Sequence, residues 1–190
     1  MIRNITILLL LSLSYSQPCD DNELTEINGA CYYQSDLDVL DDFINNSDGS
    51  INLILDNNGD GIIEPLELCD QHWTDGRLTS LDCSPIIIDG NYNWLGISGV
   101  IPPTISNWSE IQFLSFYYND LIGNVPNTIC SLDIDFSDPN SFSLYGNELC
   151  PPYPECIEDY IGSQSNWGTG SCAIGNCYDI GVTAFTAVEE

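Results

Sequence analysis

An acidic segment of the chain places oxygen-bearing side chains at a spacing that suits a metal ion. Carboxylate or amide groups stand at its positions 1, 3, 5, 9 and 12, and Gly61 allows a sharp turn at position 6. Such a set, completed by the backbone carbonyl at position 7, supplies the oxygen ligands that Ca²⁺ prefers. The segment therefore predicts a calcium site whose ligands are Asp56, Asn58, Asp60, Ile62, Glu64 and Glu67.

Residues 56–67 resemble the calcium-binding loop of EF-hand proteins. They match the pattern D-x-[DN]-x-[DN]-G-x5-E at every required position, and Ile63 is apolar at position 8, as in that family. Pro65, at position 10, departs from the family because it restricts where a following helix can begin. The resemblance implies one EF-hand-like loop with a structural Ca²⁺ rather than a paired sensor domain. The alternative is an acidic turn in a chain that is acidic throughout.

The charge balance excludes several classes of partner. The 190 residues include 29 Asp and Glu but only 2 Lys and Arg, which gives a formal net charge of -27. Because no positive patch can form, neither nucleic acid nor an anionic membrane surface is expected as a partner. Yet 43% of the residues are hydrophobic, so the chain can bury a core.

Catalytic signatures are weak, and we expect no enzyme. His72 is the only histidine, which excludes a multi-histidine metal site, and no Gly-x-Ser-x-Gly nucleophile motif occurs. Beside Trp73, His72 is expected to pack within a cap rather than to catalyse. Pairs of carboxylates suited to a glycosidase must arise by chance among so many acids, so they carry no weight.

The N-terminus has the layout of a secretory signal peptide over residues 1–16. Arg3 precedes an apolar run over residues 5–13, and Ser14 and Ser16 stand at the −3 and −1 positions of a cleavage site. A membrane anchor is the alternative, but the apolar run is too short to span a bilayer. We therefore expect a secreted or cell-surface protein without membrane insertion.

The cysteines of an exported chain predict disulfide bonds, and this sequence has 9. Zinc is the alternative, but no Cys-x-x-Cys pair exists and one histidine cannot complete a mixed cage. Local pairs are favoured for Cys150 with Cys156 and for Cys172 with Cys177, while the other pairings stay open. Because the count is odd, one thiol stays free, bonds another molecule or pairs outside this chain. The disulfide candidates are Cys31, Cys69, Cys83, Cys150, Cys156, Cys172 and Cys177.

A repeated pattern marks the middle of the chain. The pattern of residues 99–102 recurs 24 residues later at 123–126. Apolar residues lie between the two copies at regular spacing, and Asn119 stands shortly before the second copy. This pattern resembles the plant-type extracellular leucine-rich repeat, and less regular copies lie over 78–90 and 142–149. In that family the asparagine hydrogen-bonds backbone groups across the turn. The resemblance implies an α/β solenoid, a short leucine-rich repeat of about 2.5 turns with parallel strands.

The flanks resemble the caps of the same family. Residues 32–46 carry apolar side chains at helical spacing and predict a helix that starts at Ser35 and Asp36. Cys83 stands at an inward position, which implies a disulfide back into the N-terminal cap. The Gly-, Ser- and Asn-rich tail favours a chain that is part of a larger multidomain surface protein. The expected organisation is a signal peptide 1–16, an N-terminal cap 17–77 with the calcium loop 56–67, repeats 78–149, a C-terminal disulfide cap 150–161, and a linker or further segment 162–190.

In leucine-rich repeat proteins the outward strand residues form a concave recognition face. The register places Tyr117 in line with Tyr145, so we expect their rings to stack, with Phe113 beside them. The sequence thus predicts a binding module for a protein or glycan, structurally stabilised by Ca²⁺. The alternatives are a calcium-dependent carbohydrate-active protein, or aromatic side chains that merely cover neighbouring turns. The ligand-face candidates are Ser80, Asp82, Ser84, Phe113, Ser115, Tyr117, Ser141, Ser143 and Tyr145.

Overall fold

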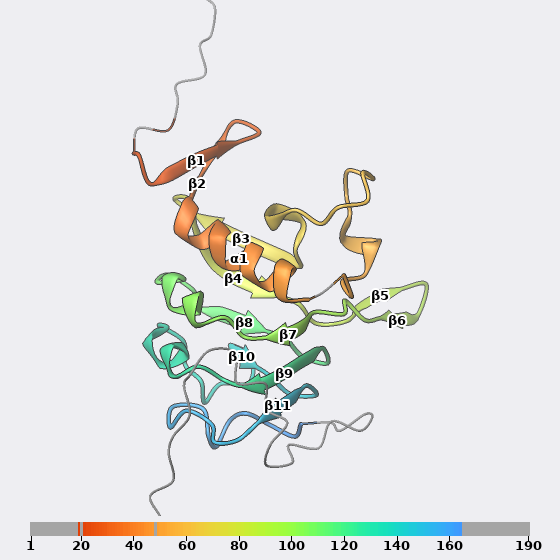
Figure 1. Ribbon diagram of the computed structural model, residues 1–190, viewed down its shortest axis with the longest axis vertical. Coiled ribbons are helices and arrows are strands. Elements are labelled where there is room, and N and C mark those ends of the chain that lie inside the picture. The colour runs from red at the N-terminus through yellow and green to blue at the C-terminus, as the bar shows by residue number, and fades with distance from the viewer. Residues whose placement is uncertain (1–18, 20, 48, 165–190) are drawn as a thin grey trace, which may run out of the picture.

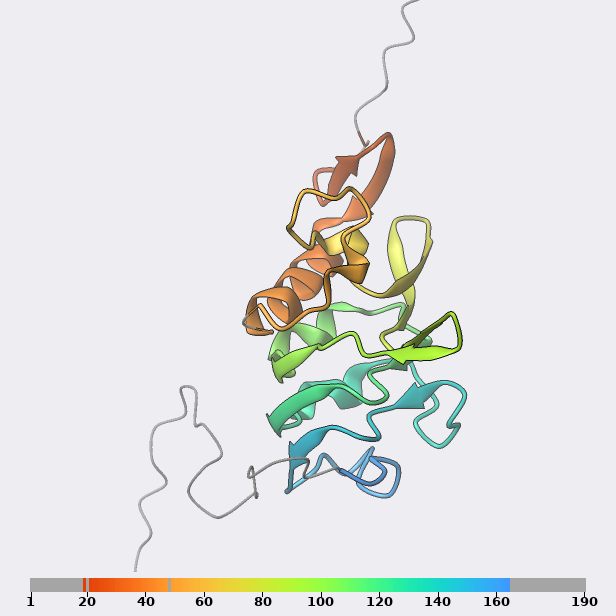
Figure 2. The same cartoon turned by 90° about the vertical axis from the view of Figure 1, so that its right-hand side faces the viewer.

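A computed structural model describes Cys19, residues 21–47 and residues 49–164. The predicted signal peptide, Cys172, Cys177 and most of the predicted segment 162–190 lie outside this part of the chain. Within it, the elements follow one another along the long axis of the molecule, from an N-terminal hairpin to the last strand (Figures 1 and 2). No helix among these residues is long and apolar enough to cross a membrane.

Three antiparallel hairpins are closed by the same kind of turn. They pair β1 (Leu24–Ile27) with β2 (Ala30–Tyr33), β3 (Asp70–Thr74) with β4 (Arg77–Asp82), and β5 (Ile86–Ile88) with β6 (Asn91–Asn93). Each loop has two residues, Asn28-Gly29, Asp75-Gly76 or Asp89-Gly90, and all six have positive φ. Asn-Gly and Asp-Gly adopt this geometry readily, and its twist matches that of the flanking strands.

The remaining strands pair in parallel. β8 (Phe113–Ser115) lies between β4 and β10 (Phe142–Ser143), so the four-stranded sheet has the order β10-β8-β4-β3 and mixed directions. β9 (Asp120–Asn124) lies between β7 (Ser98–Val100) and β11 (Glu148–Cys150) in a second, parallel sheet. Each parallel ladder contains only two or three residue pairs.

The predicted α/β solenoid is wrong. The described residues form four small sheets, two of them separate antiparallel hairpins and one of mixed direction, with a single α-helix, α1 (Gln34–Asn46). The connections before β8 and β10 contain the 3-10 turns η3 (Pro103–Asn107) and η4 (Asn127–Ser131) instead of α-helices. Local turn chemistry explains part of the difference, because Asp89-Gly90 closes an antiparallel hairpin after β4. In addition, too few regular copies of the repeat remain to stack into a solenoid.

Helix α1 confirms the helix predicted over residues 32–46, although it begins at Gln34 rather than at Ser35 and Asp36. Its apolar face is buried because hydrophobic residues recur at helical spacing. Asp36 does not cap the helix. Its side chain is instead fully buried and accepts a hydrogen bond from the backbone N–H of Leu78 at 2.9 Å. The helix is therefore tied to the start of β4.

The core joins this helix to the strands. Phe43 of α1 stacks against Trp108, with ring centroids 5.6 Å apart, and against Phe116, with centroids 4.7 Å apart. The Trp108 indole N–H donates to the backbone carbonyl of Asp36 at 3.0 Å, so its buried polar atom is satisfied. One continuous apolar cluster extends from Val39 in the helix to Ile161 near the last described residue.

Buried asparagines link neighbouring strands. Asn119 accepts a hydrogen bond from the Ile97 backbone N–H at 3.0 Å and donates one to the Cys83 carbonyl at 2.7 Å. The backbone-bonding role implied for Asn119 is therefore confirmed. Asn147, also buried, makes equivalent bonds at the next strand end.

Replacing Asn119 with alanine should lower the free energy of unfolding by about 1–3 kcal/mol, because the Ile97 N–H and the Cys83 carbonyl lose their buried partner. Urea denaturation followed by circular dichroism measures the change. Asn91→Ala, at an exposed position of the β5–β6 hairpin, is the control and should change stability much less. Equal stability of Asn119→Ala and wild type would show that water replaces the side chain without cost.

Three disulfides are present among the described residues: Cys19–Cys31, Cys69–Cys83 and Cys130–Cys156. The predicted bond from Cys83 back into the N-terminal region is confirmed. The predicted pair Cys150–Cys156 is wrong, because Cys156 bonds Cys130 across 26 residues. Cys150 is also disulfide-bonded. A preference for pairs near in sequence failed here because the fold brings η4 beside the segment after β11.

Candidate functional site

The predicted calcium segment folds into a loop between two 3-10 turns, η1 (Leu53–Leu55) and η2 (Pro65–Glu67). Asp56 organises its first half. One of its carboxylate oxygens accepts from the backbone N–H of Gly59 at 2.7 Å, and the other accepts from that of Gly61 at 2.8 Å. Both glycines have positive φ, which lets the chain curl around the carboxylate.

Glu67 closes the loop from its far end. It is only 8% exposed, and one carboxylate oxygen accepts from the backbone N–H groups of Asn57 at 2.9 Å and Asn58 at 3.1 Å. The Asn58 side chain in turn donates to the Glu64 carboxylate at 3.2 Å. The structure thus brings predicted ligands from the start and the end of the segment together.

The loop has no internal counterion. Arg77, the one Lys or Arg in the described part, pairs with Asp36 at 2.7 Å instead. No group of three or more His, Cys, Asp or Glu side chains in that part is already arranged to hold a metal ion. The carboxylates of Asp56 and Glu67 accept from loop N–H groups, and the exposed Ile62 donates its own N–H to Asp60 at 2.8 Å. The donor set is nevertheless entirely oxygen, so its chemistry fits Ca²⁺.

A cluster of exposed aromatic rings lies where β8 and β10 end. The rings of Tyr117 and Tyr145 stack with centroids 5.6 Å apart and an interplanar angle of 23°, as expected from the sequence. Tyr118 contacts both rings edge-on, with centroids 4.5 Å and 5.4 Å away, and also meets Trp94 at 5.4 Å. We call these four residues the aromatic surface.

The aromatic surface remains open to solvent. Tyr117 is 39% exposed, Tyr145 is 38% exposed and Trp94 is 53% exposed. Hydrogen bonding and charge from the neighbouring Tyr118 phenol raise the pKa of Tyr145 above its usual value, and burial adds a smaller contribution. The Tyr145 phenol therefore stays neutral at physiological pH and presents a hydrogen-bonding group at the rim of an apolar platform.

The predicted ligand face agrees with the structure only in part. Ser115 is only 5% exposed, and its hydroxyl lies 2.9 Å from that of Ser84, another residue of the predicted face, so little of it is open to a ligand. The Asp82 carboxylate accepts from the backbone N–H of Ser84 at 2.9 Å and stabilises the strand end. Phe113 is partly covered, as are the other serines of the predicted face: Ser80, Ser141 and Ser143.

The sequence interpretation missed two members of the aromatic surface. Trp94 lies in the stretch 91–98, which interrupts the repeated pattern and was therefore assigned no register. Tyr118 follows Tyr117 directly, and strand alternation would place it on the opposite face. The structure gives Tyr118 a positive φ of 51°, which turns its ring back toward Tyr145. The signal in the sequence that could have indicated Tyr118 is its position directly after Tyr117.

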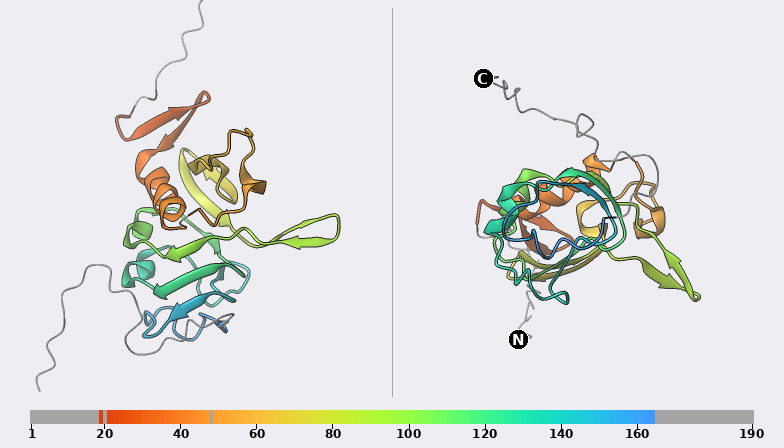
Figure 3. Two further views of the ribbon diagram at one scale, coloured as in Figure 1. Left: turned by 45° about the vertical axis from the view of Figure 1, so that its right-hand side comes forward. Right: turned by 90° about the horizontal axis from the view of Figure 1, so that it is seen from below.

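The β5–β6 hairpin projects from the body of the molecule beside this surface (Figure 3). Its large apolar side chains are exposed: Ile86, Ile87, Ile88 and Tyr92. Trp94 follows β6 and joins the hairpin to the aromatic surface through its contact with Tyr118. Trp94 is therefore the link between the exposed side chains of the hairpin and the aromatic surface.

No protein-family model matches this chain, and no curated protein sequence matches it. Its function is therefore argued from the geometry of its own residues.

Proposed function

We propose that this protein is a non-catalytic extracellular binding module that recognises a partner protein through the aromatic surface. The exposed stack of Tyr117 on Tyr145 carries the proposal. Exposed aromatic rings held in place by one another lose little conformational entropy on binding, and tyrosine and tryptophan supply much of the energy of protein interfaces. A contiguous exposed apolar region of this kind is typical of an interaction site.

The neighbouring hairpin favours a protein as the partner. Ile87 is 61% exposed and Tyr92 is 67% exposed. They belong to the β5–β6 hairpin, which projects from the body of the molecule (Figure 3), where a cleft of another protein can enclose it. The net charge of -27 favours a partner whose surface is neutral or basic. Such a partner would cover the hairpin and the aromatic surface together.

Export from the cell agrees with the covalent structure. Three disulfides among the described residues are consistent with folding in an oxidising compartment. The signal-peptide pattern at residues 1–16 supports secretion or display at the cell surface.

Calcium has a structural role in this proposal. The loop from Asp56 to Glu67 would hold one Ca²⁺ through the predicted side-chain oxygens and the Ile62 carbonyl. The ion would offset carboxylates that have no cationic side chain beside them in the part of the chain that the structure describes. Because Glu67 is buried beside Leu68, the ion would also fix η2 against the core. In this role the ion neutralises carboxylate charge and fixes the shape of the loop, and it takes no part in a reaction.

A calcium-dependent carbohydrate-active protein is the second candidate. The observation that favours it is the openness of the aromatic surface, since tyrosine and tryptophan rings can also pack against the apolar faces of sugars. Both candidates use the same residues, so a screen has to include both ligand classes.

Replacing Tyr117 with alanine should weaken partner binding about thirtyfold, which corresponds to the roughly 2 kcal/mol of a central aromatic contact. The secreted chain is screened against arrays of extracellular proteins and of glycans, and the dissociation constant of each hit is measured by surface plasmon resonance. Leu53→Ala, which changes an exposed apolar residue that belongs to neither the aromatic surface nor the β5–β6 hairpin, is the control. Hits that bind Tyr117→Ala and Tyr145→Ala as well as wild type would contradict the proposal.

A further inference from the structure

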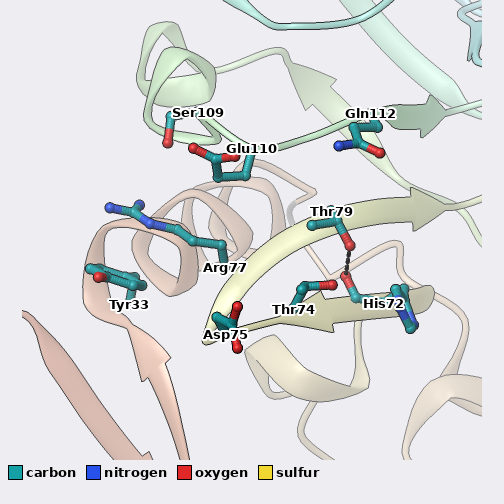
Figure 4. A pocket seen from close by; sticks show the side chains of 9 residues that line it. All are labelled: Tyr33, His72, Thr74, Asp75, Arg77, Thr79, Ser109, Glu110 and Gln112. Carbon is teal, nitrogen blue, oxygen red and sulfur yellow. Dashed lines mark hydrogen bonds between the residues drawn. The ribbon is translucent and has the colours of Figure 1, made fainter.

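A polar cavity lies between the β3–β4 hairpin and the segment that leads into β8. Its volume is about 720 Å³, which is in the range of small-molecule sites. Figure 4 shows Ser109, Glu110 and Gln112 on one side and Thr74, Asp75 and Thr79 on the other. Tyr33, His72 and Arg77 complete the lining. His72 is thus an exposed residue of β3 beside this cavity, and not the packed cap residue expected from the sequence.

Arg77 gives the cavity one fixed cationic group. Its Nη1 donates to Asp36 at 2.7 Å and to the Ser35 hydroxyl at 3.2 Å, and its guanidinium carbon lies 3.5 Å from the centroid of the Tyr33 ring. The structure shows no hydrogen bond from its Nε or Nη2 among the described residues. A guanidinium held on two sides in this way is preorganised to donate to a ligand.

The charges around the cavity select the class of ligand. A purely cationic ligand would offer no acceptor to Arg77, whose charge Asp36 already balances, and an anionic one would meet Asp75 and Glu110 in a chain of net charge -27. A neutral ligand with several hydroxyl groups avoids both conflicts and can use every kind of lining group. Its hydroxyls can donate to the two carboxylates and accept from the guanidinium, the Gln112 amide and the threonine hydroxyls.

We propose that this cavity binds a neutral sugar residue. Glu110 and Asp75 accept hydrogen bonds from sugar hydroxyls, while Arg77 and Gln112 donate to sugar oxygens. Thr79 already donates to the His72 carbonyl at 3.1 Å and keeps its own oxygen available as an acceptor. The proposal goes beyond the protein-binding function, because the cavity is lined by none of the residues of the aromatic surface.

Saturation-transfer NMR tests this site with the secreted chain and a panel of neutral sugars at millimolar concentration: glucose, galactose, mannose, fucose and N-acetylglucosamine. Glucuronate and glucosamine serve as the charged probes. We expect transfer to at least one neutral sugar and weaker transfer to both charged probes. The double variant Glu110→Ala/Gln112→Ala should raise the dissociation constant of that sugar about tenfold or more. Both residues are exposed, so the melting temperature should stay unchanged.

Tyr117→Ala separates this site from the aromatic surface. Sugar binding that survives Tyr117→Ala and is lost in the double variant supports the cavity, whatever the outcome for the partner protein. Sugar binding that Tyr117→Ala removes, and that the double variant keeps, would place the sugar on the aromatic surface and overturn the proposal. Absence of transfer to every neutral sugar, or stronger transfer to a charged probe, would overturn it as well.

Discussion

Replacing Asp36 with alanine should destabilise the protein by about 3 kcal/mol, the lower end of the cost of breaking a buried ion pair, because its partner Arg77 is partly exposed to solvent. Asp36 is 0% exposed, and its carboxylate accepts from Arg77 Nη1 at 2.7 Å and from the Leu78 backbone N–H at 2.9 Å. The alanine variant would leave the Leu78 backbone N–H without its buried acceptor, and Arg77 with only the Ser35 hydroxyl and solvent as acceptors. It would also loosen the link between α1 and β4, because this side chain joins them.

Chemical denaturation of wild type and Asp36→Ala measures this difference. Asp38→Ala is the matched control on the same helix, since Asp38 is exposed and accepts only a surface hydrogen bond from the Gln34 amide at 2.7 Å. The control should lose less than about 1 kcal/mol. Asp36→Asn keeps one acceptor but no charge, and its stability should fall between those of Asp36→Ala and wild type. Equal loss in Asp36→Ala and Asp38→Ala would show that the ion pair adds nothing beyond an ordinary surface contact.

Calcium should stabilise the protein by about 2.7 kcal/mol when its free concentration is a hundred times the dissociation constant. The expected cause is occupation of the loop from Asp56 to Glu67, whose carboxylates have no cationic partner among the described residues. Chelator should therefore lower the melting temperature, and most at low ionic strength, where the carboxylates repel one another most strongly. Moderate sodium chloride should restore only part of the loss, because screening cannot supply a coordinated ion.

Thermal melts with calcium or with chelator, each at low and moderate sodium chloride, test this expectation, and titration calorimetry counts the bound ions. Glu67→Gln should remove most of the affinity, since the bidentate ligand is lost while one acceptor for the loop N–H groups remains. Glu155→Gln, at an exposed site outside the loop, should leave the affinity unchanged. Full recovery by sodium chloride alone would show that only the general acidity of the chain matters.

Short-range patterns in the sequence predicted local features well. The helical spacing of Leu37, Leu40 and Phe43 located α1, because burial of one helix face depends on residues close in sequence. The side-chain bonds of Asn119 were predictable, because an asparagine at a turn needs backbone partners nearby. The stacking of Tyr117 on Tyr145 followed from register alone.

Features set by distant residues were not predictable in the same way. The Cys130–Cys156 bond depends on how η4 meets the segment after β11, and sequence spacing does not report that contact. The solenoid prediction extended one regular copy to its neighbours and ignored three signals of another kind. These were Asn28-Gly29, Asp75-Gly76 and Asp89-Gly90, each of which closes an antiparallel hairpin. Alternation placed Ser115 on the predicted face, but could not show that its hydroxyl pairs with that of Ser84 and leaves Ser115 almost fully covered.

The β5–β6 hairpin has a consequence for how copies of this protein behave together in solution. It is a two-stranded sheet, so each strand has an outer edge with no neighbouring strand among the described residues. Its three consecutive isoleucines are exposed. Exposed apolar edge strands of this kind tend to pair with the same strand of another copy. Each copy also carries a formal charge of -27, so two copies repel one another before their hairpins can meet. Charge repulsion between copies therefore opposes self-association and leaves the edge of the hairpin available to a different molecule. The repulsion weakens wherever salt screens the charge or low pH reduces it.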